Sequence, residues 1–294
     1  MYLQKMMEDW KHKLYDEMDL QPAIDEMGVR NLLDVLLENT GNKESYVREN
    51  VLTALYTLAF AKPVLSVDDY IHMLNISISE THLFNGIDST DDDAALCRGF
   101  SSFGVAYAVY ADAKQGFLSD AQFITVFDKA IQYMISEKDR RGFIYGGKGI
   151  VHTIPHGAYL IKALIEHPKF SDEHADRVLD CIKSNIVGKG RFAADDWADM
   201  RIAGLISPLL IKGIPEDTIK KWIKTLLPNI PAYIGRYTDE HYPYVQMGSD
   251  IQHFLMYVYY DLKKKATHEA FREWIFEYSI EQGMLWNKVY LYQA

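Results

Sequence analysis

Arginine, histidine and aspartate, the residue types that hold anions and transfer protons, recur along the middle of the chain at a nearly constant spacing. They are Arg98, then His152 and His156, then Asp199 and Arg201, then Asp250 and His253. The successive intervals from residue 98 to 152, from 152 to 201 and from 201 to 253 are 54, 49 and 52 residues. If the fold repeats with that period, these side chains converge along one rim of the molecule. The rim would be a site for a polar ligand.

Arg98 fits two roles. It can form a structural ion pair with Asp139 or Asp199, since a buried arginine paired with a carboxylate is a common architectural element. It can also contact an anionic ligand directly. The neighbouring Gly99 and Gly104 permit close helix packing, which favours the structural role.

His152 and His156 have the i, i+4 spacing of a helical metal pair. Pro155, however, belongs in the first turn of a helix, so His152 is expected to precede that helix. No third ligand is evident, because Tyr159 follows His156 by about one turn. We therefore expect no metal and no cofactor, and a histidine pair that makes structural or substrate contacts.

Two other segments partly match known ligand-binding motifs, one a nucleotide-binding loop and the other a calcium-binding loop. Residues 142–149 match G-x-x-x-x-G-K, but Gly149 follows the lysine where a nucleotide loop needs Ser or Thr. We expect a turn between helices whose glycines adopt positive φ. Residues 88–93 are acidic but lack the central glycine and closing glutamate of a calcium loop, so they are expected to cap the helix that holds Arg98.

The elements that carry these residues are predicted to be helices almost throughout. Apolar residues recur at helical spacing, as in the leucine-rich stripe within 32–37 and the stripe from Phe123 to Met134. Residues typical of helix starts recur 53, 52, 44 and 52 residues apart. They stand at Ser66, Ser119, Ser171, Pro215 and Thr267.

This period predicts an all-α fold of about six stacked αα-hairpins, forming one domain over residues 1–294. An open armadillo/HEAT-like superhelix is favoured, and a closed α/α toroid is the alternative. The longer polar loops 85–93, 139–151, 188–197 and 236–248 would then emerge at one end. Tyrosines are dense in the C-terminal third, which fits packing or the lining of a sugar or peptide site.

Composition restricts the function classes. The chain has 31 Lys and Arg against 41 Asp and Glu, a net charge of −10, and no strong basic patch, so nucleic-acid binding is not expected. No stretch approaches the ~18 apolar residues of a membrane span, so no membrane partner is expected either. With two cysteines and no leader pattern, a reducing, cytoplasmic location is expected.

Several segments in this order resemble the bacterial domain-of-unknown-function family 2785. They are Arg98-Gly-Phe-Ser-Ser, residues 137–142, residues 148–152 and His156-Gly-Ala, within a similar region from about 65 to 227. The resemblance implies a site at Arg98, Ser101, Asp139, Arg141, His152, His156, Asp199 and Arg201. The chain departs from the family pattern at Ile150 in place of Trp, Pro155 in the first turn, Tyr159 in place of Asp, and Ala198 in place of an acid. The family has no established activity, so the resemblance implies a fold and not a reaction.

Two functions compete. The first is a non-catalytic scaffold that binds a peptide, a protein or a small polar ligand, for which the negative charge favours a basic segment. The second is a hydrolase or transferase acting on an anionic small molecule. There, Arg98 and Arg141 would hold the anion, and His156 with Asp139 or Asp199 would transfer protons.

Overall fold

The structure, a computed structural model, describes residues 6, 18–89, 91–187, 198–226 and 242–291. The chain divides into two compact units, Met1–Lys169 and Phe170–Ala294. Most described residues of both units are helical, and the described strands form one two-stranded sheet. The predicted all-α class is therefore confirmed. The superhelix, the toroid and the single domain stay predictions.

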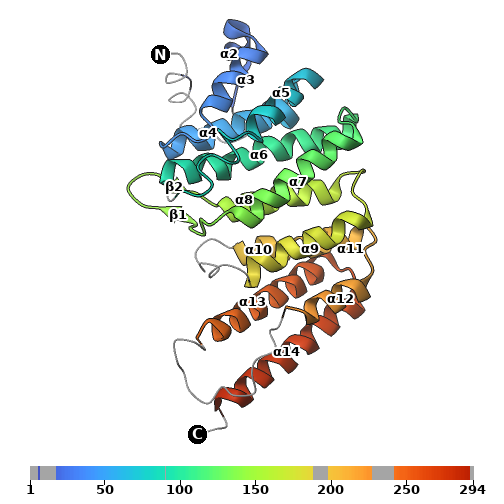
Figure 1. Ribbon diagram of the computed structural model, residues 1–294. Coiled ribbons are helices and arrows are strands. Elements are labelled where there is room, and N and C mark those ends of the chain that lie inside the picture. The colour runs from blue at the N-terminus through green and yellow to red at the C-terminus, as the bar shows by residue number, and fades with distance from the viewer. Residues whose placement is uncertain (1–5, 7–17, 90, 188–197, 227–241, 292–294) are drawn as a thin grey trace. The chain divides into compact units, whose positions relative to one another are not determined.

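In the first unit each helix packs on helices one or two places away in the sequence (Figure 1). Its elements are α2 (Gln21–Met27), α3 (Val29–Glu38), α4 (Ser45–Tyr56) continued by the π-helix η1 (Thr57–Ala61), α5 (Val67–Ser77), α6 (Asp92–Gln115), α7 (Asp120–Ser136), β1 (Phe143–Ile144), β2 (Gly149–Ile150) and α8 (Thr153–Glu166). Helix α6 packs against α4, α5 and α8, and α8 also packs against α7. The three helices α4, α6 and α8 thus form one layer with α6 in the middle.

The second unit is organised around α13, which packs against α9, α10, α11 and α14. Its elements are α9 (Asp172–Val187), α10 (Ala198–Ala203), α11 (Ile206–Ile211), α12 (Glu216–Lys224), α13 (Tyr242–Lys265) and α14 (Glu269–Leu291). The loop predicted over 188–197 lies outside the described residues. Of the loop predicted over 236–248, residues 236–241 also lie outside the described residues, and the prediction is wrong from Tyr242 onward, where α13 begins with Pro243 in its first turn.

The predicted capping chemistry is confirmed at Ser66 and Ser119, but not at Thr267, because α14 begins only at Glu269 and the Thr267 hydroxyl is buried without a hydrogen-bond partner. The Ser66 and Ser119 hydroxyls each accept a hydrogen bond from the backbone N–H three residues on, and the side chains of Asp69 and Gln122 accept from the serine N–H in return. The Asp91 carboxylate caps α6 by accepting from the N–H of Asp93 at 2.9 Å. The acidic segment before Arg98 therefore is a helix cap, as predicted.

The predicted apolar stripes form the core. Leu32, Leu33, Leu36 and Leu37 of α3 are all buried, as is the α7 stripe from Phe123 to Met134. Among the described helices none is long and apolar enough to cross a membrane.

The glycine-rich segment forms a β-hairpin that was not predicted from the sequence. Strands β1 and β2 are antiparallel, with Phe143 opposite Ile150 and Ile144 opposite Gly149. Gly146, Gly147 and Gly149 have φ values of 80°, 91° and 77°, so the expected positive φ is confirmed. The hairpin lies between α7 and α8 and carries Lys148 next to the start of α6.

Candidate functional site

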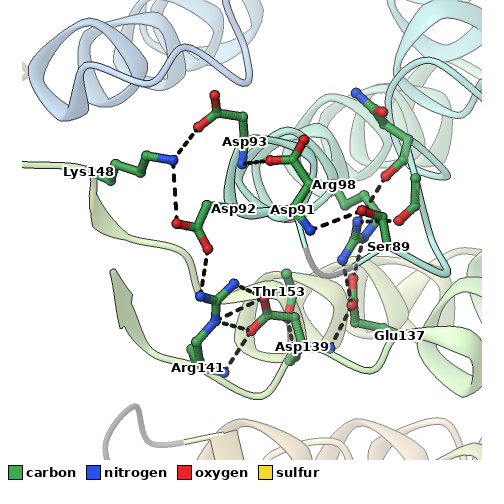
Figure 2. A network of polar contacts seen from close by, with 12 residues as sticks. Ser89, Asp91, Asp92, Asp93, Arg98, Glu137, Asp139, Arg141, Lys148 and Thr153 are labelled. Carbon is green, nitrogen blue, oxygen red and sulfur yellow. Dashed lines mark hydrogen bonds and ion pairs between the residues drawn. The ribbon is translucent and has the colours of Figure 1, made fainter. Parts of the chain in front are cut away.

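Arg98 is in the core and is fully engaged in an ion pair (Figure 2). Its side chain is 1% exposed, and Nε and Nη2 donate to the two carboxylate oxygens of Glu137 at 2.7 and 2.9 Å. Its Nη1 donates to the carbonyls of Asn85 and Gly86 at 2.8 and 3.0 Å. The expected structural pairing is found, but the partner is Glu137, directly after α7, instead of Asp139 or Asp199.

Asp139 and Arg141 continue from this pair toward solvent. The N–H of Asp139 donates to Glu137 at 2.9 Å, and the Asp139 carboxylate accepts from Arg141 Nη2 at 2.5 Å. Arg141 Nη1 donates to Asp92 at 2.7 Å, while Lys148 pairs with Asp93 at 2.7 Å (Figure 2). These bonds tie the loop after α7 and the β-hairpin to the first turn of α6.

We call this network the polar anchor. Its members are Asp92, Asp93, Arg98, Glu137, Asp139, Arg141 and Lys148. The hydrogen bond from Arg141 lowers the pKa of Asp92, and the hydrogen bond to Asp93 raises the pKa of Lys148. The hydrogen bond to Asp139 raises the pKa of Arg141 further above its usual range. Each charge is thus held by an opposite neighbour, and the network fixes the hairpin and the start of α8 in place.

A second buried arginine, Arg48 of α4, holds the hairpin from the other side. It is 0% exposed, and its Nη2 donates to the carbonyls of Lys148 and Ile150, the latter at 3.1 Å. Its Nη1 donates to the Asn42 carbonyl at 2.6 Å, and its guanidinium lies 4.8 Å from the centre of the Phe100 ring. Burial lowers the pKa of Arg48. This residue was not among those predicted from the sequence.

The two histidines lie at the start of α8. His152 is the N-cap residue, with a left-handed φ of 45°, so the prediction that it precedes the helix is confirmed. The following Thr153 donates to the Asp139 carbonyl at 2.6 Å, which links the histidines to the polar anchor. His156 Nδ1 lies 3.2 Å from the Gly99 carbonyl and therefore donates to it. The two imidazole centres are 5.5 Å apart.

His156 also belongs to a row of touching rings across three helices, which we call the aromatic face. Its members are Tyr56 and Phe60 of α4 and η1, Phe103, Tyr107 and Tyr110 of α6, and His156 and Tyr159 of α8. The Phe103 ring is 4.5 Å from His156 and 5.2 Å from Tyr159, centre to centre. All of its members except Tyr107 are partly exposed.

The aromatic face was not predicted from the sequence, in which the dense tyrosines of the C-terminal third stood out instead. A signal was present, because Phe103, Tyr107 and Tyr110 have the i, i+4, i+7 spacing of one helix face. His152, His156 and Tyr159 repeat that spacing 49 residues later. Helices α6 and α8 therefore present matching stripes.

One edge of the aromatic face is polar. The Tyr110 hydroxyl donates to Glu166 at 3.1 Å. Burial and the Glu166 charge raise the pKa of Tyr110 well above its usual value, and burial likewise raises the pKa of Tyr159. Both phenols are therefore neutral hydrogen-bonding groups at physiological pH.

On α4, burial raises the pKa of the half-buried Glu49 carboxyl.

The predicted site residues are distributed over both units of the chain. Arg98, Asp139 and Arg141 belong to one network, and His152 and His156 lie beside it. Ser101 is 0% exposed, one turn from Cys97, and does not reach the surface. Asp199, whose carboxylate accepts from the N–H of Met200 at 2.8 Å, and the exposed Arg201 lie in α10 of the second unit. Among the described residues, no three His, Cys, Asp or Glu side chains gather as metal ligands do.

Comparison with known proteins gives a family and no activity. No curated protein and no solved structure matches this chain. A family model described as a protein of unknown function, DUF2785, matches residues 83–259, which is more than half of the chain. The match covers the polar anchor, α6 and α8, and extends further toward the C-terminus than the motifs that carry the resemblance. The chain therefore belongs to the DUF2785 family of proteins of unknown function.

Proposed function

We propose that this protein is a binding module that holds a segment of another polypeptide against the aromatic face. The observation that carries the proposal is the unbroken row of ring contacts from Tyr56 across Phe103 to Tyr159, with partly exposed rings on three helices. Rigid aromatic rings offer a large contact area at little entropic cost, and tyrosine adds a hydroxyl for hydrogen bonds. Rings of this kind are the residues enriched in binding interfaces.

The alternative of a hydrolase or transferase receives no support from the same residues. All three guanidinium nitrogens of Arg98 already donate hydrogen bonds inside the core. Arg141 is committed to Asp139 and Asp92. The two groups needed to hold an anionic substrate are thus both neutralised by carboxylates of the chain itself, and the polar anchor serves to position α8 and its rings.

A selection from displayed random short peptides tests the proposal. The full-length protein is the bait, and each enriched peptide is then measured by calorimetry against the wild type and the variant Phe103→Leu/Tyr159→Leu. Leucine keeps apolar bulk while removing the ring faces. We expect the variant to lose binding while it still unfolds cooperatively, at a melting temperature lowered only by the lost ring contacts. The matched control is Tyr145→Leu, because Tyr145 is 87% exposed at the hairpin and its ring contacts Phe143, outside the aromatic face.

The proposal is wrong if selection yields no binders, or if the binders are as tight for the double variant as for the wild type. Hydrogen exchange supplies a second readout that needs no variant. A bound peptide should slow exchange in α6, in α8 and at the α4–η1 junction, the elements that carry the aromatic face, and leave α2, α3 and α7 unchanged.

A further inference from the structure

We infer that the bound segment supplies an arginine or lysine side chain, whose cation lies against the rings of Phe103, Tyr110 and Tyr159 beside Glu166. This inference rests on the proposed function and specifies the chemistry of its ligand. It assigns the aromatic face as a cation-binding surface.

The distribution of charge favours a basic ligand. Residues 1–169, the unit that carries the aromatic face, contain 16 Lys and Arg against 24 Asp and Glu, so this unit has a net charge of −8. The whole chain has a net charge of −10. A basic segment is therefore attracted chiefly to the first unit and loses part of that attraction as salt is added.

The chain already places its own cations on rings of this layer. The Arg48 guanidinium lies 4.8 Å from the centre of Phe100, and Lys114 Nζ lies 5.8 Å from the centre of Phe60. Both distances are within the range of a cation–π interaction. Within the described part of the chain, no cation lies over Phe103, Tyr110 or Tyr159. Because all three residues are also partly exposed, a cation from outside can reach their rings.

A carboxylate stands at the edge of those rings. Glu166 accepts a hydrogen bond from the Tyr110 hydroxyl and pairs with Lys162, one turn earlier on α8, at 3.6 Å. The Lys162 and Glu166 side chains are about equally exposed, at 42% and 41%, and such surface pairs are weak. An incoming cation can therefore share or replace Lys162 at Glu166. A ring face next to a carboxylate is the combination that binds guanidinium and ammonium groups.

The test measures how tightly each peptide enriched by selection binds the wild-type full-length protein. Each arginine is replaced in turn by citrulline, which keeps the shape and removes the charge, and each lysine by norleucine. We expect one cation at a fixed position whose replacement weakens binding about tenfold. Glu166→Gln should weaken binding of the parent peptide and leave the citrulline peptide unaffected. Glu173→Gln, a change of the same type in α9, is the matched control.

The outcomes separate the two proposals. Peptides that bind the aromatic face without a fixed cation, or that bind equally well with citrulline, overturn this inference and leave the proposed function standing. If no peptide binds through the aromatic face, the proposed function fails and this inference fails with it. Because the citrulline comparison changes only the peptide, its result does not depend on whether any protein variant folds.

Discussion

Glu137 determines whether the buried charge of Arg98 is tolerated. Both carboxylate oxygens bond to the guanidinium, and both side chains are at most 1% exposed. Glu137→Gln keeps the volume but leaves a buried cation without its counter-charge. We expect the free energy of unfolding in urea to fall by about 3–5 kcal/mol.

The neighbouring residue provides the control for that measurement. Lys138 pairs with Asp88 at 2.8 Å, but the two side chains are 63% and 83% exposed. Lys138→Gln should therefore cost less than about 1 kcal/mol. Equal losses for the two variants would show that burial of the Arg98–Glu137 pair does not make it more important to the fold than a surface pair.

Arg48 should matter for the β-hairpin more than for helix content. Its guanidinium donates to backbone carbonyls on both sides of Gly149 and to Asn42. Lysine has the charge but not the planar fork, so Arg48→Lys leaves carbonyls unsatisfied. We expect faster hydrogen exchange at residues 143–151 and a loss on the order of 2–3 kcal/mol in the free energy of unfolding. Unchanged exchange in the hairpin would contradict this role.

At the scale of elements, the Asp69 carboxyl at the start of α5 makes the stability of the fold depend on pH. Burial raises the pKa of Asp69, but the hydrogen bonds from Ser66 and the ion pair with Arg30 outweigh that effect and lower it. A depressed pKa means that Asp69 stabilises the fold above its unfolded-state pKa of about 3.9. The stabilisation is lost as the pH falls through the lower, folded-state pKa.

Asp69→Asn tests this pH dependence. At neutral pH the variant should be less stable than the wild type by about 1 kcal/mol, the usual value of a helix cap. The difference should persist on acidification to about pH 5, decline below about pH 3.9 and vanish once the pH is below the folded-state pKa. Urea titrations at a series of pH values measure it. A difference that grows as the pH falls would have the wrong sign.

These helix starts could be predicted from sequence because a capping side chain bonds to residues close to it in the sequence. Ser66, Ser119 and Asp91 bond within three residues of themselves, so their role needs no knowledge of the rest of the fold. The β-hairpin was missed because its strands are two residues long, too short for an alternating pattern. Two of its backbone carbonyls accept hydrogen bonds from Arg48, which lies about a hundred residues earlier in the chain.

Which helix face a residue occupies was harder to predict. Each residue advances about 100° around a helix, so a change of one or two residues in the repeat moves a side chain from surface to core. Arg98 shares the repeat spacing of His152, yet it faces the core and pairs with Glu137, while Phe103 nearby is partly exposed. Equal spacing in the sequence therefore does not determine which side of its helix a residue faces.

At the scale of the whole molecule, the convergence of Arg98, His156 and Arg201 stays a prediction. The first two belong to one compact unit and the third to the other. Intervals between helix starts range from 44 to 53 residues, so the sequence period does not determine how successive hairpins are rotated. Each of the two units encloses buried aromatic residues of its own, such as Phe127 in the first and Phe254 in the second.

These two phenylalanines make a matched pair for testing whether the units unfold separately. Both are 0% exposed, so each Phe→Ala change should cost about 3–5 kcal/mol. In repeat architectures stability is largely a sum of local terms, so we expect Phe127→Ala to speed hydrogen exchange mainly within residues 18–169 and Phe254→Ala mainly within 170–291. If either change accelerates exchange equally in both units, the chain unfolds as one cooperative body, and the single domain expected from the sequence is the better description.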